Sequence, residues 1–114
     1  MKNNEKELLI ELLQNQTTRT ELCVLLKTND CSARDRVREI SLEQPIISHS
    51  KAKGYRICNV EKLKFKNNHD EIKNEILELE HTINEINSRI RELAKRRIPI
   101  LKALKELKEQ LKND

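Results

Sequence analysis

Glycine, proline and aromatic residues are scarce in this chain of 114 residues, which has one Gly, two Pro, one Tyr, one Phe and no Trp. With so few residues that punctuate helices or favour turns, long helices are expected and long loops are not. Any apolar core must be built from Leu, Ile and Val. Charged residues make up 37% of the sequence, which suits thin, exposed helices better than a thick globule.

Cysteine is present at Cys23, Cys31 and Cys58, an odd count without a CxxC pair. This pattern excludes a disulfide framework and the usual spacing of a zinc site. No apolar run approaches the roughly 20 residues of a membrane span, and the polar, acidic N-terminus is unlike a signal peptide. The sequence therefore predicts a cytoplasmic protein in a reducing compartment, without a membrane partner.

The charge of the chain gives little guidance to its partners. The net charge is +4, and residues 1–60 hold 10 basic and 8 acidic groups. A surplus of four positive charges does not by itself indicate a protein that binds nucleic acid. Evidence for such binding has to come from local clusters of basic residues.

Apolar residues at helical spacing predict three helices in the first part of the chain, over 4–14, from Thr18 onward, and over 32–43. Thr18 and Glu21 fit a capping box at the start of the second helix. In the third helix Ala33, Val37 and Ile40 share one face. That face is expected to point into the core, with the charged residues of the helix opposite.

After the third helix the pattern changes to two short β-type runs, 45–48 and 55–58, around a polar segment at 49–54. This predicts a β-hairpin. The one glycine of the chain, Gly54, lies in its turn, where a positive φ would require it. We call residues 45–58 the wing and residues 49–54 the wing tip.

From about Asn68 an apolar residue recurs at alternating intervals of four and three, which predicts a helix with a heptad seam. The members of the seam are Ile72, Ile76, Leu79, Ile83, Ile86, Ile90 and Leu93. The register continues to Leu111, with Arg97 at one seam position. Pro99 predicts a kink, and the absence of loop residues around it favours one long arm over a helical hairpin.

Three helices followed by a hairpin is the order of a winged helix-turn-helix domain, which places its third helix in the major groove of DNA. Arg34 and Arg38 lie one turn apart on the exposed face of that helix, and Arg pairs bidentately with guanine or phosphate. The wing carries Lys51, Lys53 and Arg56 but no acidic residue between Gln44 and Val60. A hairpin of one charge sign is expected to meet phosphates. A charged helix face is more often simply exposed to solvent. DNA binding is therefore favoured only by the combination of the element order, the arginines of the third helix and the basic hairpin.

The stretch from Arg38 through Pro45-Ile46-Ile47-Ser48 to Lys53-Gly54-Tyr55-Arg56-Ile57 resembles the N-terminal winged helix domain of biotin operon repressors. It is also similar to small winged helix proteins of phages and mobile elements. The resemblance covers residues 4–58 and implies that Arg34, Asp35 and Arg38 lie on the reading helix and Lys51, Lys53 and Arg56 on the wing. The turn at 27–31 is longer than in the usual motif, so the third helix can start before Ser32.

Catalytic and cofactor patterns are missing. His49, His69 and His81 are far apart in sequence, and there is no Gly-rich phosphate loop or metal-ligand spacing. We therefore expect no enzyme, no cofactor and no metal.

The predicted fold is mainly α, with a winged helix-turn-helix domain at 1–60 and a helical coiled-coil arm at 61–114 that associates with further copies, a dimer being favoured. The leading function is a sequence-specific regulator of transcription that binds double-stranded DNA. Two alternatives remain open: an accessory protein that binds a replication or transfer origin, and a phage module that inhibits a host protein.

Overall fold

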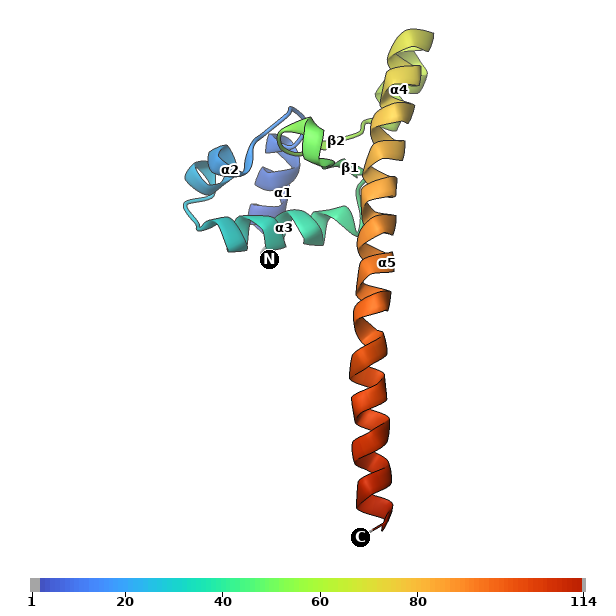
Figure 1. The fold of residues 1–114 in the computed structure, drawn as a ribbon. Coiled ribbons are helices and arrows are strands. Elements are labelled where there is room, and N and C mark those ends of the chain that lie inside the picture. Colours follow the sequence, from blue (N-terminus) through green and yellow to red (C-terminus); the bar gives the residue numbers. More distant parts are fainter. Residues whose placement is uncertain (1–2, 114) are drawn as a thin grey trace. The chain divides into compact units, whose positions relative to one another are not determined.

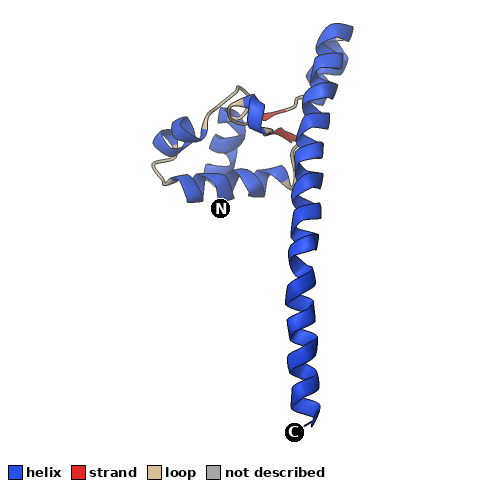
Figure 2. Ribbon diagram, viewed as in Figure 1, coloured by secondary structure: helices blue, strands red, loops and turns tan. Residues whose placement is uncertain are grey.

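The computed structural model describes residues 3–113 and is mainly helical, with one small antiparallel sheet (Figures 1 and 2). In chain order its elements are α1 (Asn3–Leu12), α2 (Arg19–Leu25), α3 (Asp30–Ser41), β1 (Ile46–Ile47), the 3₁₀ turn η1 (Ser50–Ala52), β2 (Arg56–Ile57), α4 (Val60–Lys66) and α5 (His69–Asn113). Within this part of the chain no helix is both long and apolar enough to cross a membrane.

Side-chain caps fix where several helices begin. The Thr18 hydroxyl accepts a hydrogen bond from the Glu21 backbone N–H at 3.2 Å, which confirms the predicted start of α2. The start predicted for α3 at Ser32 is wrong by two residues, because Asn29 is its N-cap and accepts from the Ser32 N–H at 2.8 Å. The first residue of α3 is therefore Asp30.

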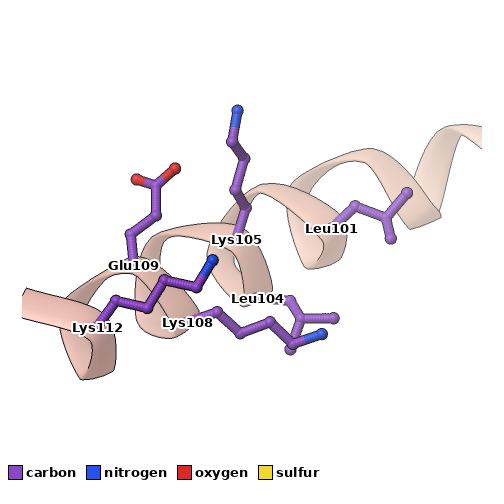
Figure 3. A pocket seen from close by; sticks show the side chains of 6 residues that line it. All are labelled: Leu101, Leu104, Lys105, Lys108, Glu109 and Lys112. Atoms are coloured by element: carbon purple, nitrogen blue, oxygen red, sulfur yellow. The ribbon is translucent and has the colours of Figure 1, made fainter.

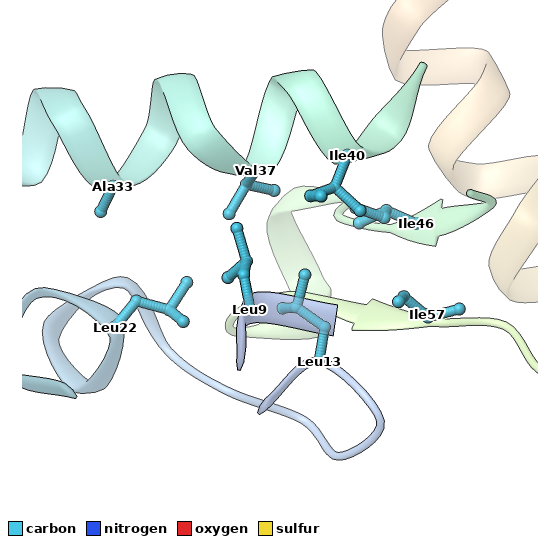
Figure 4. Packing of buried hydrophobic residues seen from close by; sticks show 8 residues of the cluster. All are labelled: Leu9, Leu13, Leu22, Ala33, Val37, Ile40, Ile46 and Ile57. Atoms are coloured by element: carbon cyan, nitrogen blue, oxygen red, sulfur yellow. The ribbon is translucent and has the colours of Figure 1, made fainter. Parts of the chain in front are cut away.

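The core of the first part of the chain is built from aliphatic side chains of α1, α2, α3 and both strands (Figure 4). Its members are Leu9, Leu13, Leu22, Ala33, Val37, Ile40, Ile46 and Ile57. The predicted inward face of the third helix, with Ala33, Val37 and Ile40, is confirmed. Because α3 buries one face completely, its opposite face is presented to solvent.

The hairpin is present, with Ile46 paired to Ile57 and Ile47 paired to Arg56. The segment before α2 adds a third line of pairing, since Thr17 and Tyr55 exchange backbone hydrogen bonds of 3.0 and 2.9 Å. Gly54 has φ +133°, and a Cβ at this position would lie 2.5 Å from the carbonyl oxygen of Thr17. Glycine is therefore required twice here, for its backbone angle and for the close approach.

Residues 59–67, between the hairpin and α5, contain the helix α4, for which the sequence analysis predicts no element. Asn59 caps its start by accepting from the Lys62 N–H at 3.0 Å, and Asn67 ends it in the left-handed conformation with φ 51°. The exposed fraction of Phe65 in α4 is 91%, so the helix has little apolar packing of its own.

The helix α5 starts where predicted, since the Asn68 side chain accepts from the N–H groups of Asp70 and Glu71 at 3.1 and 3.3 Å. It is continuous through Pro99, which confirms one long helix over a helical hairpin. The chain divides into a first unit that ends at Thr82 and a second that begins at Ile83. The first turns of α5 thus group with the helices and hairpin of the first unit.

Candidate nucleic-acid interface

The exposed face of α3 carries the three residues that sequence analysis assigned to the reading helix. The side chains of Arg34, Asp35 and Arg38 are 41%, 73% and 69% exposed. Each arginine has a carboxylate nearby: Arg34 lies 3.6 Å from Asp30, and Arg38 lies 3.6 Å from Asp35. Surface pairs of this length contribute little to stability, so both guanidinium groups remain available to a ligand.

Two neighbours favour the charged form of Arg34. A hydrogen bond with Cys31, and then the charge of Asp30, raise the pKa of Arg34 above its ordinary value. Asp30 also lies 3.6 Å from Arg19, at the start of α2. The N-terminal end of α3 therefore alternates positive and negative groups and is not uniformly basic.

The wing tip is a short 3₁₀ turn with exposed lysines. Lys51 and Lys53 are both exposed, and Lys53 adopts the left-handed conformation with φ 54°. Gln16 anchors the tip by donating to the Ala52 carbonyl at 2.6 Å. In the view of Figure 1 the tip lies away from α3, on the other side of α1. The lysines of the tip and the arginines of α3 therefore form two separate basic groups.

Arg56, the third basic residue of the wing, is held by an acidic partner. Its guanidinium donates two hydrogen bonds to the Glu75 carboxylate of α5, with Nη1 to Oε2 at 2.8 Å. The pair is partly buried, with 27% of the Arg56 side chain and 16% of the Glu75 side chain exposed. The hydrogen bonds from Arg56 lower the pKa of Glu75 against the opposing effect of burial. Arg56 thus has a structural role in tying β2 to α5.

Three further contacts join the wing to α5, and the sequence pattern predicts none of them. The buried imidazole of His49 lies against the Glu78 carboxylate and stacks at a tilt on His81, with ring centroids 5.5 Å apart. The Ser48 N–H donates to the buried hydroxyl of Thr82 at 3.4 Å. Lys51 borders a shallow hollow of about 380 Å³ beside this cluster. The partners are 29 and 34 residues apart, so no local pattern reveals them.

The predicted seam of α5 is divided between the two units. Ile72 and Leu79 are half-buried in the first unit, on the side of α5 that meets the wing. The other five predicted members are about half exposed: Ile76, Ile83, Ile86, Ile90 and Leu93. From Ile83 onward no other element among the described residues of the second unit packs against the seam.

The cysteines differ in environment, and none forms a disulfide within the described residues. Cys23 packs at the edge of the core, as expected for a small apolar residue, and Cys31 is exposed. Burial, reinforced by the neighbouring Glu75 carboxylate, raises the pKa of the Cys58 thiol to about 11. Cys58 is therefore protonated at neutral pH.

Between residues 3 and 113, no group of three or more His, Cys, Asp or Glu side chains is arranged to hold a metal ion. Comparison of the chain with models of protein families, with curated proteins and with solved structures gave no significant match.

Proposed function

We propose that this protein binds double-stranded DNA in a sequence-specific manner through α3, as a regulator of transcription with a winged helix-turn-helix head. One observation carries the proposal. The core packs against a single face of α3, and the solvent-exposed side presents Arg38, with the partly exposed Arg34 one turn before it. A helix anchored in this way, after a second helix and a short turn, has the arrangement with which helix-turn-helix domains enter the major groove.

The two basic groups are assigned different tasks in this proposal. Arg34 and Arg38 contact base edges, where bidentate pairing with guanine distinguishes sequences. Asp35 accepts from cytosine N4 when base pairs displace its contact with Arg38. Lys51 and Lys53 neutralise phosphates, which adds affinity without sequence preference. The proposal does not depend on Arg56, because Glu75 already matches its charge.

Selection of bound sequences from a pool of random duplex DNA tests this function. The expected result is one enriched motif, bound with a log–log salt slope of roughly −3 to −6 per head. Arg91→Ala, which removes an exposed arginine of α5, is the matched control for Arg38→Ala, and only the latter should weaken the selected site. Mapping the bound sites in a genome then separates a regulator of transcription from a protein that binds a replication or transfer origin.

A second candidate, a module that binds and inhibits another protein, is favoured by the carboxylates beside Arg34 and Arg38. Asp30 and Asp35 make the α3 face mixed in charge, as surfaces that bind proteins commonly are. This candidate predicts no salt-dependent binding to any duplex pool. The acid-free wing tip argues for DNA.

A further inference from the structure

A stripe of eight large aliphatic side chains follows α5 from the start of the second unit. The free stripe, as we call it, consists of Ile83, Ile86, Ile90, Leu93, Ile100, Leu104, Leu107 and Leu111. Their exposed fractions lie between 47% and 77%. The intervals alternate between three and four residues, and Arg97 occupies the one seam position without an aliphatic residue. Such a stripe is stable in water only when another apolar surface covers it.

We propose that the free stripe is covered by the same stripe of a second copy of this chain, running antiparallel to the first. The regular heptad spacing favours a helical partner, because the seam residues of one helix fit into the spaces between seam residues of another with the same repeat. The same stripe on a second copy of the chain has this repeat. This inference does not rest on the proposed DNA binding.

The surface available agrees with a pair of helices. A Leu or Ile side chain carries roughly 100 Å² of apolar surface, so eight that are somewhat more than half exposed offer roughly 450 Å² per copy. A standard interface between proteins buries about 800 Å² per partner, of which a little over half is apolar. The free stripe thus supplies the apolar part of a stable interface between two copies.

Arg97 favours the antiparallel direction. In a parallel pair in register, equivalent seam positions face each other, so Arg97 of one copy would meet Arg97 of the other. No carboxylate is available to compensate, because the positions that border the seam from residue 83 onward hold Asn87, Arg89, Ala94, Arg96, Leu101, Ala103, Lys108 and Gln110. An antiparallel pair that overlaps the whole stripe brings both Arg97 residues near its middle, but in neighbouring layers, each opposite Leu93 or Ile100 of the other copy. Past that aliphatic residue the long side chain of Arg97 reaches water.

The remaining residues of the second unit are compatible with this pair. Pro99 lies two positions after Arg97, on the outer side of the helix, and leaves the seam unobstructed. Leu101 borders the stripe beside Leu104, and Figure 3 shows both projecting from a single helix with Lys105 and Lys108 nearby. Leu101 widens the apolar surface on one edge, and the lysine stems extend it.

Sedimentation equilibrium of the full chain tests the association. At tens of micromolar we expect twice the mass of one chain. Ile86→Lys places a charge in the seam and should give a single chain, whereas Ser88→Lys adds the same charge on the outer face and should keep the pair. Circular dichroism of both variants checks that the helices remain. A monomeric wild type, a mass of three or more chains, or an undiminished mass for Ile86→Lys would overturn the proposal.

Crosslinking tests the direction. In a background of Cys23→Ala and Cys31→Ser, one variant carries Asn87→Cys and a second, with an affinity tag, carries Lys108→Cys. These positions are about 32 Å apart along a helix, more than a short bismaleimide can span. The antiparallel pair predicts crosslinks between the two variants in a mixture and few within either alone. Crosslinks within each variant alone, without mixed product, would show a parallel pair and contradict the proposal.

Discussion

Arg56 in β2 and Glu75 in α5 form an ion pair through two hydrogen bonds, the Nη1 to Oε2 bond being 2.8 Å long. With the contacts of His49 and Ser48, this pair attaches the wing to the first turns of α5. The wing of this protein is consequently held from two sides, by α5 and by Thr17.

Loss of the Glu75 carboxylate should destabilise the first unit. Glu75→Gln leaves the partly buried guanidinium of Arg56 without its charged partner, and we expect the free energy of unfolding to fall by about 1–3 kcal/mol. Glu71→Gln, which removes an exposed carboxylate one turn earlier on α5, is the control and should change it by less than about 0.5 kcal/mol. Urea denaturation measures both. Equal effects of the two substitutions would show that the pair contributes nothing specific.

The same pair predicts how stability depends on pH. Arg56 lowers the pKa of Glu75 in the folded state. The ion pair therefore contributes its full stabilisation above the pKa of about 4.3 of Glu in the unfolded chain. This stabilisation is lost as the pH falls through the lower pKa that Glu75 has in the folded state. The stability difference between wild type and Glu75→Gln should therefore be constant from pH 7 to about pH 5 and shrink below about pH 4. Denaturation curves over this range test it. A difference that grows on acidification would contradict the assignment.

Gly54 should not tolerate a side chain. Gly54→Ala introduces a Cβ at 2.5 Å from the Thr17 carbonyl oxygen, at a φ of +133°. Because the two nearest atoms are the backbone O and C of Thr17, the wing must shift, and we expect a loss of about 2 kcal/mol or more in the free energy of unfolding. Lys53→Ala is the control, since a residue with a Cβ already occupies its left-handed position. A melting temperature unchanged by Gly54→Ala would show that the contact with Thr17 is not required.

Two of the three thiols, Cys31 and Cys58, should react with alkylating reagents at different rates. Cys31 is exposed, whereas Cys58 is buried and its pKa of about 11 leaves almost no thiolate at neutral pH. The test is alkylation of the folded protein at roughly pH 7.5–8, where part of an ordinary thiol, with a pKa of about 8.5, is ionised. The reagent should modify Cys31 first and leave Cys58 unmodified until the chain unfolds. Peptide mapping by mass spectrometry gives the order. Modification of Cys58 as fast as Cys31 would refute its burial.

Part of the fold follows from local patterns in the sequence. Ala33, Val37 and Ile40 repeat at helical spacing, so the inward face of α3 can be predicted. The helix α4 was missed because Val60, Leu63 and Phe65 form no single apolar stripe. Asn59 and Asn67, which bound it as caps, were the signal available.

The candidate site could be predicted only in part. Arg34 and Arg38 were placed on an exposed face because their position follows from the helical period alone. The partner of Arg56 could not be found, since Glu75 is 19 residues away and the pairing depends on how α5 packs. The half-burial of Ile72 and Leu79 has the same cause, because a heptad pattern does not say which surface covers each member.

The central claim, that α3 reads duplex DNA, is tested most directly by fluorescence anisotropy titrations of the selected duplex and its single-base variants. The measurements compare wild type, Arg34→Ala, Arg38→Ala and the double variant Lys51→Ala with Lys53→Ala at three salt concentrations. Arg38→Ala should cost about 1–3 kcal/mol on the selected site and flatten discrimination at one base position. The double variant should weaken all sequences alike and make the log–log salt slope shallower by about two. If Arg38→Ala and Arg34→Ala both keep the affinity and base discrimination of the wild type, α3 is not the reading element.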